Sequence, residues 1–195
     1  MAPLVYFVRH GQTDWNVESR FQGQHDVDIN ATGRAQAHGN GRRLAELIDE
    51  PARFDYVASP LRRTRETMDI VRTELGLEPN GYRLEPRLME LHFGDWQGLT
   101  IDQVEKAFPG SEEARERDKW GFLPPGASAE NYEMLSERVR PWFEAIDRDT
   151  VCVTHGGVIR SIFLQTGSAS RAEAEMLDVP QDRILRFAGG RLDWL

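Results

Sequence analysis

Two histidines in this sequence each follow a short apolar run and precede a glycine. His10 stands in Val8-Arg9-His10-Gly11, and His155 follows Thr150 to Thr154. A neutral imidazole can act as the nucleophile of a covalent mechanism. The charge of a neighbouring arginine lowers the pKa of a histidine from its usual value of about 6.5, so Arg9 favours the neutral ring of His10. His10 is therefore our candidate nucleophile for phosphoryl transfer.

Phosphoryl transfer also needs positive charge around the phosphoryl oxygens and a proton for the departing oxygen. Arg63 stands at the start of a predicted helix, where the helix dipole also attracts anions. Glu90 has apolar neighbours, and such surroundings raise the pKa of a carboxyl group toward the range of a general acid. Taken singly, His10 could be a strand-end histidine that only forms hydrogen bonds, and Glu90 could be an ordinary surface glutamate.

The elements that would position these residues alternate between strands and helices. We expect strands at 3–8, 54–59, 82–86 and 150–154, a hairpin over 184–194, and helices at 32–47, 59–76, 100–108, 129–147, 158–166 and after Ser170. Ser59 is predicted to cap its helix and Gly76 to end it. This order predicts a three-layer α/β/α sandwich with a mostly parallel sheet, formed as a single domain over 1–195.

In an open α/β sheet, ligands bind beyond the carboxyl ends of the strands, where His10 and His155 both stand. The two histidines therefore could face one pocket. Residues 99–128 are expected to form a lid insertion, of which 111–127 is the least regular part of the chain. Aromatic and polar residues are candidates for the rim of the pocket: Trp15, Phe21, Gln22, His92 and Trp120.

Composition narrows the class of partner. The net charge of −8 disfavours a general nucleic-acid binder, which would present a basic surface. No apolar run reaches the ~20 residues needed to cross a bilayer, and no secretory signal precedes the first strand. With a single cysteine, Cys152, the chain forms no internal disulfide, which fits a cytoplasmic location. We expect a small phosphorylated metabolite as the ligand and consider a homodimer as the assembly.

Five blocks of the sequence together resemble the histidine phosphatase superfamily, also called the phosphoglycerate mutase-like family. The blocks run from Val8 to Asn16, Asp28 to Ala37, Ser59 to Thr67, Met89 to Trp96 and Val153 to Gly157. They occur in the family's order and lie within residues 4–160. The resemblance implies the family's fold and a phosphohistidine mechanism.

In that mechanism His10 attacks phosphorus while Glu90 protonates the departing oxygen. Arg9, Arg63 and His155 would complete the catalytic set, with His155 most useful as a cation. Five further residues are expected to contact the substrate or its phosphate: Thr13, Asn16, Gln22, Gly23 and Gly156. No metal or other cofactor is required, because arginines and histidines supply the positive charge. Glu90 could then activate water to cleave the phosphohistidine.

Both hydrolases and mutases occur in this family. The short chain, the absence of a longer insertion between Glu90 and His155, and the run Phe93 to Gly98 favour a phosphomonoester phosphatase. The alternative is a phosphoglycerate mutase that depends on 2,3-bisphosphoglycerate. One departure is that Gly126 to Glu130 replaces the Gly-Gly-Glu-Ser of many phosphatases, so an acidic residue is missing there.

Two other classes fit the sequence less well. A metal hydrolase would use His10, His92, His155 and Glu90, but the flanking arginines disfavour a cation and no helical His-x-x-x-His spacing occurs. A phosphate-binding module without turnover would usually lose His10 or Glu90, and this chain has both.

Overall fold

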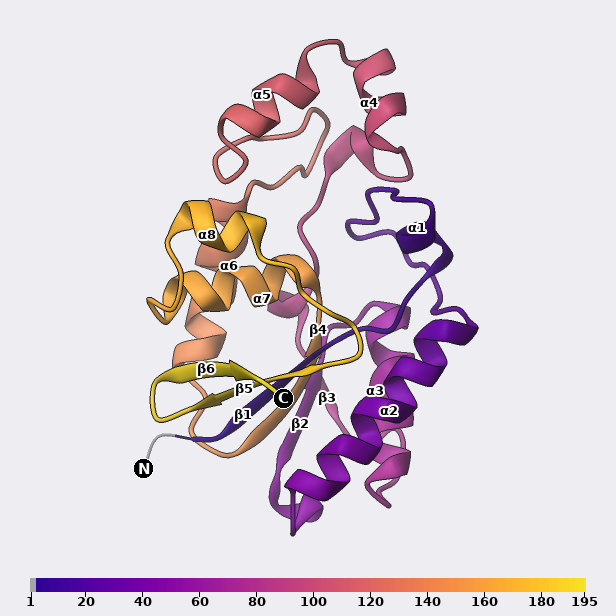
Figure 1. Ribbon diagram of the computed structural model, residues 1–195, viewed down its shortest axis with the longest axis vertical. Coiled ribbons are helices and arrows are strands. Elements are labelled where there is room, and N and C mark those ends of the chain that lie inside the picture. The colour runs from indigo at the N-terminus through magenta and orange to yellow at the C-terminus, as the bar shows by residue number, and fades with distance from the viewer. Residues whose placement is uncertain (1–2) are drawn as a thin grey trace.

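The computed structural model describes residues 3–195 and contains a six-stranded sheet between two layers of helices (Figure 1). The strands are β1 (Val5–Arg9), β2 (Asp55–Ala58), β3 (Arg83–Leu84), β4 (Thr150–Thr154), β5 (Ile184–Ala188) and β6 (Arg191–Trp194). They lie in the order β3-β2-β4-β1-β5-β6. The first four are parallel to one another, and β5 and β6 form an antiparallel hairpin beside β1. The predicted α/β/α sandwich with a mostly parallel sheet is confirmed.

Each face of the sheet is covered by a pair of helices (Figure 1). Side chains of α2 (Ala31–Leu47) and α3 (Arg62–Glu74) pack on one face, and those of α6 (Tyr132–Glu144) and α7 (Gly156–Gln165) pack on the other. Because successive side chains of a strand point to opposite faces, Tyr6 of β1 enters the first layer and Phe7 the second. Both faces are buried, which explains why Val5 to Val8 of β1 and Val151 to Val153 of β4 form continuous apolar runs.

The remaining helices are short. They are α1 (Asp14–Val17), α4 (Ile101–Ala107), α5 (Ser111–Arg117) and α8 (Arg171–Met176), with 3₁₀ turns at Pro51–Arg53, Pro86–Leu88 and Gly94–Trp96. Capping boxes at Thr100 and Ser170 begin α4 and α8. Within the described residues, no helix combines the length and the apolar character that crossing a bilayer demands.

The predicted start of α3 is wrong, and its predicted end is confirmed. Ser59 does not cap the helix: the N-cap is Leu61, and the Ser59 hydroxyl lies 2.8 Å from Nε2 of His155 instead. At the other end, Gly76 has a positive φ of 72°, and Leu77 N donates to Arg72 O. This is the Schellman arrangement, which glycine adopts without steric cost.

The first part of the segment expected to be irregular is helical. α5 has Glu112 and Glu113 in its first turn and Arg115 and Arg117 in its last turn, so its charges complement the helix dipole. The Glu105 carboxylate also accepts hydrogen bonds from backbone N–H groups at the start of α5. Figure 1 shows α4 and α5 at one end of the molecule, beyond α1 and α8. Movement of this segment as a lid stays a prediction.

Candidate active site

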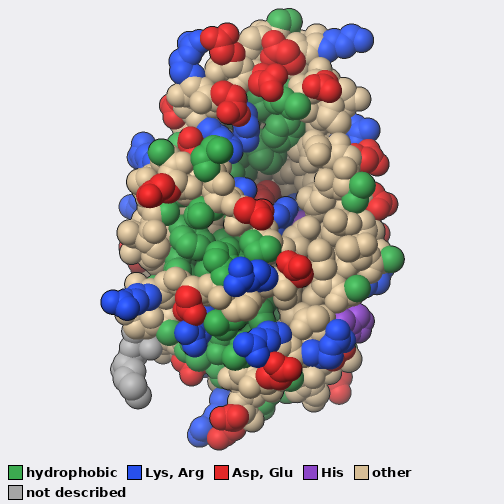
Figure 2. Space-filling view, viewed as in Figure 1, with side chains coloured by type: hydrophobic (Ala, Val, Ile, Leu, Met, Phe, Trp, Pro, Cys, Tyr) green, Lys and Arg blue, Asp and Glu red, His purple; other side chains and the backbone are tan. Residues whose placement is uncertain are grey.

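His10 and His155 meet at the carboxyl ends of two neighbouring strands, as the sequence predicted. His10 follows β1 and His155 follows β4, and His10 N donates to Thr154 O across 2.9 Å. Their ring centroids lie 5.2 Å apart. A cavity of about 160 Å³ at this point is lined by Arg9, His10, Asn16, Arg20, Phe21, Gln22, Gly23, Arg63, Glu90 and Phe93. Figure 2 shows this region as a hollow below the end of the molecule that α4 and α5 form in Figure 1, with a histidine and basic side chains at its base.

The ring of His10 is held in one tautomer. Its Nδ1 lies 2.8 Å from Gly11 O, and a carbonyl only accepts, so Nδ1 carries the proton. The lone pair is therefore on Nε2, the nitrogen available for attack. Burial, followed by the charges of Arg63 and Arg9, keeps the pKa of His10 well below its usual range. The expected effect of the Arg9 charge on the pKa of His10 is present, but burial lowers that pKa more.

Two arginines border the nucleophile, of which Arg63 is buried and Arg9 is partly buried. Arg63 is fully buried and donates to Gly23 O at 2.6 Å and His25 O at 2.7 Å, so it also shapes the loop that forms the cavity wall. Arg9 donates to Val179 O at 2.7 Å. Burial lowers the pKa of both guanidinium groups, that of Arg63 to about 10. Arg63 is therefore still a cation at neutral pH.

The second histidine is neutral in the protein's own surroundings. Burial, then the charge of Arg63, keeps the pKa of His155 well below its usual range. A cationic His155 beside a bound phosphoryl group stays a prediction, and it would need the additional anion next to the ring. Its Nε2 is paired with the Ser59 hydroxyl.

Four buried polar atoms around this cavity have no hydrogen-bond partner among residues 3–195. They are the acceptor Oε1 of Gln22 and three nitrogens: Nε of Arg9, Nε of Arg63 and Nδ1 of His155. Leaving a buried polar group unsatisfied costs roughly 1–3 kcal/mol each, so such atoms normally have partners. Each of these nitrogens can donate a hydrogen bond, and two belong to cations. Together they suit a small group rich in anionic oxygens.

The carboxyl group of Glu90 lies against the first turn of α7. Its Oε2 accepts from Gly157 N at 3.1 Å, and its Oε1 accepts from Leu91 N at 2.9 Å. Glu90 lines the same cavity as His10. The arrangement brings a nucleophile, two cations and a carboxyl group to one small cavity.

A model of the histidine phosphatase superfamily (branch 1) matches residues 5–191 of this sequence. The chain belongs to this superfamily. A glucosyl-3-phosphoglycerate phosphatase of Mycobacterium tuberculosis is 37% identical over 171 residues, which cover 83% of this chain and 74% of the relative. Phosphoglycerate mutase-like protein 4 of Arabidopsis thaliana is 31% identical and covers 96% of this chain and 81% of its own length.

Solved structures agree with this membership. The mycobacterial glucosyl-3-phosphoglycerate phosphatase in complex with VO3 superimposes with a TM-score of 0.78, at 29% identity, over 100% of this chain and 97% of that one. Other relatives are named as 2,3-bisphosphoglycerate-dependent phosphoglycerate mutases. Histidine phosphatase relatives of both reaction types therefore match this chain.

The further predicted contacts of this histidine phosphatase fall into two groups. Asn16, Gln22 and Gly23 line the cavity. Oδ1 of Asn16 accepts from Thr13 N and from Gln181 Nε2, which leaves its amide nitrogen to donate. Thr13 is fully buried, and its hydroxyl caps α1 by accepting from Asn16 N, so it shapes the loop and does not line the cavity.

Gly156 also lies outside the cavity wall. It is the first residue of α7, and a Cβ there would lie 3.4 Å from Nη1 of Arg160 and 3.7 Å from Nε of Arg9, so Gly156 lies beside these two guanidinium groups. Among the rim candidates, Phe21 and Gln22 line the cavity, whereas Trp120 is 2% exposed and stacks on Tyr132 in the core. Trp120 was therefore assigned wrongly.

The sequence missed several residues of the site. Arg20 and Phe93 line the cavity, and Gln181 donates to His10 O at 2.9 Å from a loop before β5. No local motif marks Gln181, because only the folded chain brings it beside His10. Glu130, the last residue of the run Gly126 to Glu130, forms an ion pair with Arg138.

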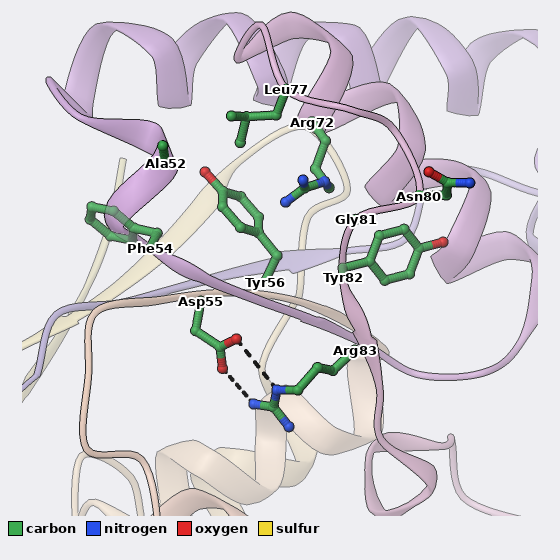
Figure 3. Close-up of a pocket in the computed structure, with 10 residues that line it drawn as sticks. All are labelled: Ala52, Phe54, Asp55, Tyr56, Arg72, Leu77, Asn80, Gly81, Tyr82 and Arg83. Carbon is green, nitrogen blue, oxygen red and sulfur yellow. Dashed lines mark hydrogen bonds and ion pairs between the residues drawn. The ribbon is translucent and has the colours of Figure 1, made fainter.

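A larger cavity, of about 540 Å³, lies elsewhere (Figure 3). It is lined by Asp55 and Arg83, which pair at the start of β2 and β3, and by the Tyr56 ring under the guanidinium of Arg72. These residues lie at the amino ends of the strands, opposite His10. Burial raises the pKa of Tyr56 to about 12, and no histidine lines this cavity, so it lacks a nucleophile for neutral pH.

Within residues 3–195 no three His, Cys, Asp or Glu side chains are grouped so that they could hold a metal ion. Arg9 and Arg63 supply positive charge near His10.

Proposed function

We propose that this histidine phosphatase hydrolyses small phosphomonoesters through a phosphohistidine on His10. The observation that carries the proposal is the set of unpartnered nitrogens of Arg9, Arg63 and His155 around the neutral ring of His10. A phosphoryl group supplies acceptors for all three. The cavities lined by Tyr56, by Trp142, by Asp26 and by Phe143 do not combine a nucleophile with such donors.

In the first step, Nε2 of His10 forms a bond to phosphorus while the bond from phosphorus to the substrate oxygen breaks. Glu90 gives its proton to that oxygen, so a neutral alcohol departs and Glu90 becomes a carboxylate. Arg9 and Arg63 hold the phosphoryl oxygens, on which negative charge is concentrated. The amide nitrogen of Asn16 donates to a third position.

His155 can assist this step while neutral. With its proton on Nδ1, it donates to a phosphoryl oxygen, and the Ser59 hydroxyl donates to Nε2. Ser59 would therefore set the tautomer of His155 as Gly11 O sets that of His10. Separately, the negative charge of the bound phosphoryl group opposes the charge of Arg63 and thereby favours protonation of the His155 ring.

In the second step, water attacks phosphorus and the bond to Nε2 breaks. The Glu90 carboxylate takes a proton from the water, which restores the acid, and inorganic phosphate leaves. The arginines provide the positive charge in both steps, so the reaction needs no metal or other cofactor. Turnover that persists in excess chelator is the expected result; strong inhibition would contradict it.

The mutase is the second candidate, because relatives bearing that name also match the chain. A panel of phosphomonoesters that includes glucosyl-3-phosphoglycerate, run beside a mutase assay with and without 2,3-bisphosphoglycerate, separates the two reactions. We expect release of inorganic phosphate. Robust isomerisation that depends on 2,3-bisphosphoglycerate would overturn the choice of hydrolase.

A cytoplasmic location and a homodimer are proposals from the sequence. Fractionation of the native cells tests the location. Light scattering of the purified protein tests the assembly, with a dimer mass expected and a monomer mass contradicting it.

A further inference from the structure

An ion pair lies directly behind the segment that carries Glu90. Arg138 of α6 and Glu130, just before that helix, form two parallel hydrogen bonds, Nε to Oε1 and Nη2 to Oε2, each 2.8 Å long. Their side chains are 22% and 16% exposed, so the pair is largely shielded from water. Two-point pairing fixes the plane of the guanidinium, and the other N–H groups then point in set directions.

The remaining N–H groups of Arg138 point to backbone carbonyl groups beside and at Glu90. Nη1 of Arg138 donates to Arg87 O at 2.7 Å and Met89 O at 3.1 Å, and Nη2 lies 3.4 Å from Glu90 O. On the other side, Oε2 of Glu130 accepts from His92 N at 3.1 Å. The pair therefore binds peptide groups before, at and after the proton donor.

The same pair reaches the loop that forms the cavity wall. Nε2 of Gln24 donates to Glu90 O at 3.0 Å and lies 3.5 Å from Oε2 of Glu130. Gln24 follows Gly23, which lines the cavity and accepts a hydrogen bond from Arg63. The acid, the ion pair and the arginine that would hold phosphate are thus joined by one set of hydrogen bonds.

Glu90 needs such support because its segment has no regular structure. Met89 to Phe93 belong to no helix or strand, so no ladder of backbone hydrogen bonds fixes them. A general acid must lie within hydrogen-bond reach of the oxygen that it protonates. The bonds of Arg138 and Glu130 replace the missing ladder.

We propose that Glu130 and Arg138 are positioning residues that hold the Glu90 carboxyl group in line with the departing oxygen. This inference rests on the proposed phosphatase reaction. Neither residue lines the cavity, so both act through Glu90 and not on the substrate. Since a misplacement of about 1 Å can cost ~100-fold in rate, loosening the segment should remove much of the contribution of the acid.

The test uses the dependence of kcat/KM on the leaving group, because kcat/KM covers only the steps up to departure of the alcohol. Arg138→Met and Glu130→Gln are expected to lower kcat/KM for a simple alkyl phosphate by roughly 10- to 100-fold. For an activated aryl phosphate, whose phenolate leaves without a proton, the loss should stay within about threefold. Arg140→Met and Glu137→Gln, at exposed positions of α6, are the matched controls and should change neither value.

A second measurement separates positioning from general damage to the fold. In a Glu90→Gln background, Arg138→Met should cause no further loss with the alkyl phosphate, because the group that it positions is already disabled. Equal losses for both substrates, or losses that multiply with Glu90→Gln, would overturn the inference. If Arg138→Met does not fold, Glu130→Gln, which keeps the shape of the side chain, decides alone.

The two proposals fail in different ways. If the wild-type protein shows no turnover that depends on His10, both the phosphatase reaction and the positioning role are refuted. Wild-type turnover that depends on both His10 and Glu90, together with unchanged leaving-group dependence in Glu130→Gln and Arg138→Met, would overturn the positioning role alone.

Discussion

Replacing Gly157 with alanine would place a methyl group against the carboxyl group of Glu90. An ideal Cβ at this position lies 2.3 Å from Oε1 of Glu90 and 3.2 Å from Cδ. The first distance is about 1.1 Å shorter than the 3.4 Å at which ordinary contact begins, so the carboxyl group must move. The bond from Gly157 N to Oε2 would be strained or lost in the same movement.

The expected result is a selective loss of catalysis. A displacement of about 1 Å predicts a decrease of ~100-fold in kcat/KM for alkyl phosphates, and a much smaller one for activated aryl phosphates. Stability should change little. Alanine is favoured over glycine within a helix by up to about 1 kcal/mol, which offsets the tight contact of the new Cβ with Leu135, 3.1 Å away.

The assay compares both substrates in Gly157→Ala and in Gly39→Ala, with unfolding by denaturant as the measure of stability. Gly39 lies in α2, and a Cβ there meets no atom within 4 Å, so this control adds the same methyl group harmlessly. Unchanged leaving-group dependence in Gly157→Ala would refute the role assigned to Glu90. Equal losses in both variants would show that the effect is not local.

Three further predictions concern the phosphate-binding groups. The pKa values of His10 and His155 lie below 6.5 in the folded protein, so their stabilising effect is present above pH 6.5 and is lost as the pH falls below it. For each of the two histidines, the unfolding free energy should fall by up to about 1.4 kcal/mol per pH unit in that range. In denaturant titrations, His155→Asn should make the unfolding free energy depend less steeply on pH. Arg63→Lys removes the fork that reaches Gly23 O and His25 O, so the inhibition constant of inorganic phosphate should rise by about tenfold or more, whereas Arg62→Lys, at an exposed position, should leave it unchanged. Ser59→Ala leaves Nε2 of His155 without its partner and should weaken phosphate binding by roughly tenfold, and calorimetry showing wild-type affinity would contradict the role of Ser59.

Much of this structure could be predicted from short-range patterns. Apolar runs marked β1 and β4, and paired glycines marked the hairpin at Gly189 and Gly190, where both φ angles are positive. His10 and His155 could be placed together because strand ends of a parallel sheet share one edge. These inferences need only local sequence and the general rules of α/β folds.

The wrong and missing sequence-based predictions share one physical origin, namely contacts between residues that are far apart in the sequence. Ser59 does not cap α3 because its hydroxyl pairs with His155, 96 residues away. Trp120 is buried by Tyr132 and not by the substrate cavity. Glu130 and Gln181 reach the site from segments whose local sequence carries no motif. Side-chain partners of this kind cannot be found without the fold.

The most direct test of the central claim is to quench the reaction in its first turnover and locate the phosphoryl group. Peptide mass spectrometry under alkaline conditions should find one phosphoryl group on the peptide that contains His10, labile to acid and absent from His10→Ala. The His10→Ala protein should also lose turnover of an aryl phosphate while retaining its fold. Phosphorylation of another residue, or turnover by His10→Ala near the wild-type rate, would contradict the account.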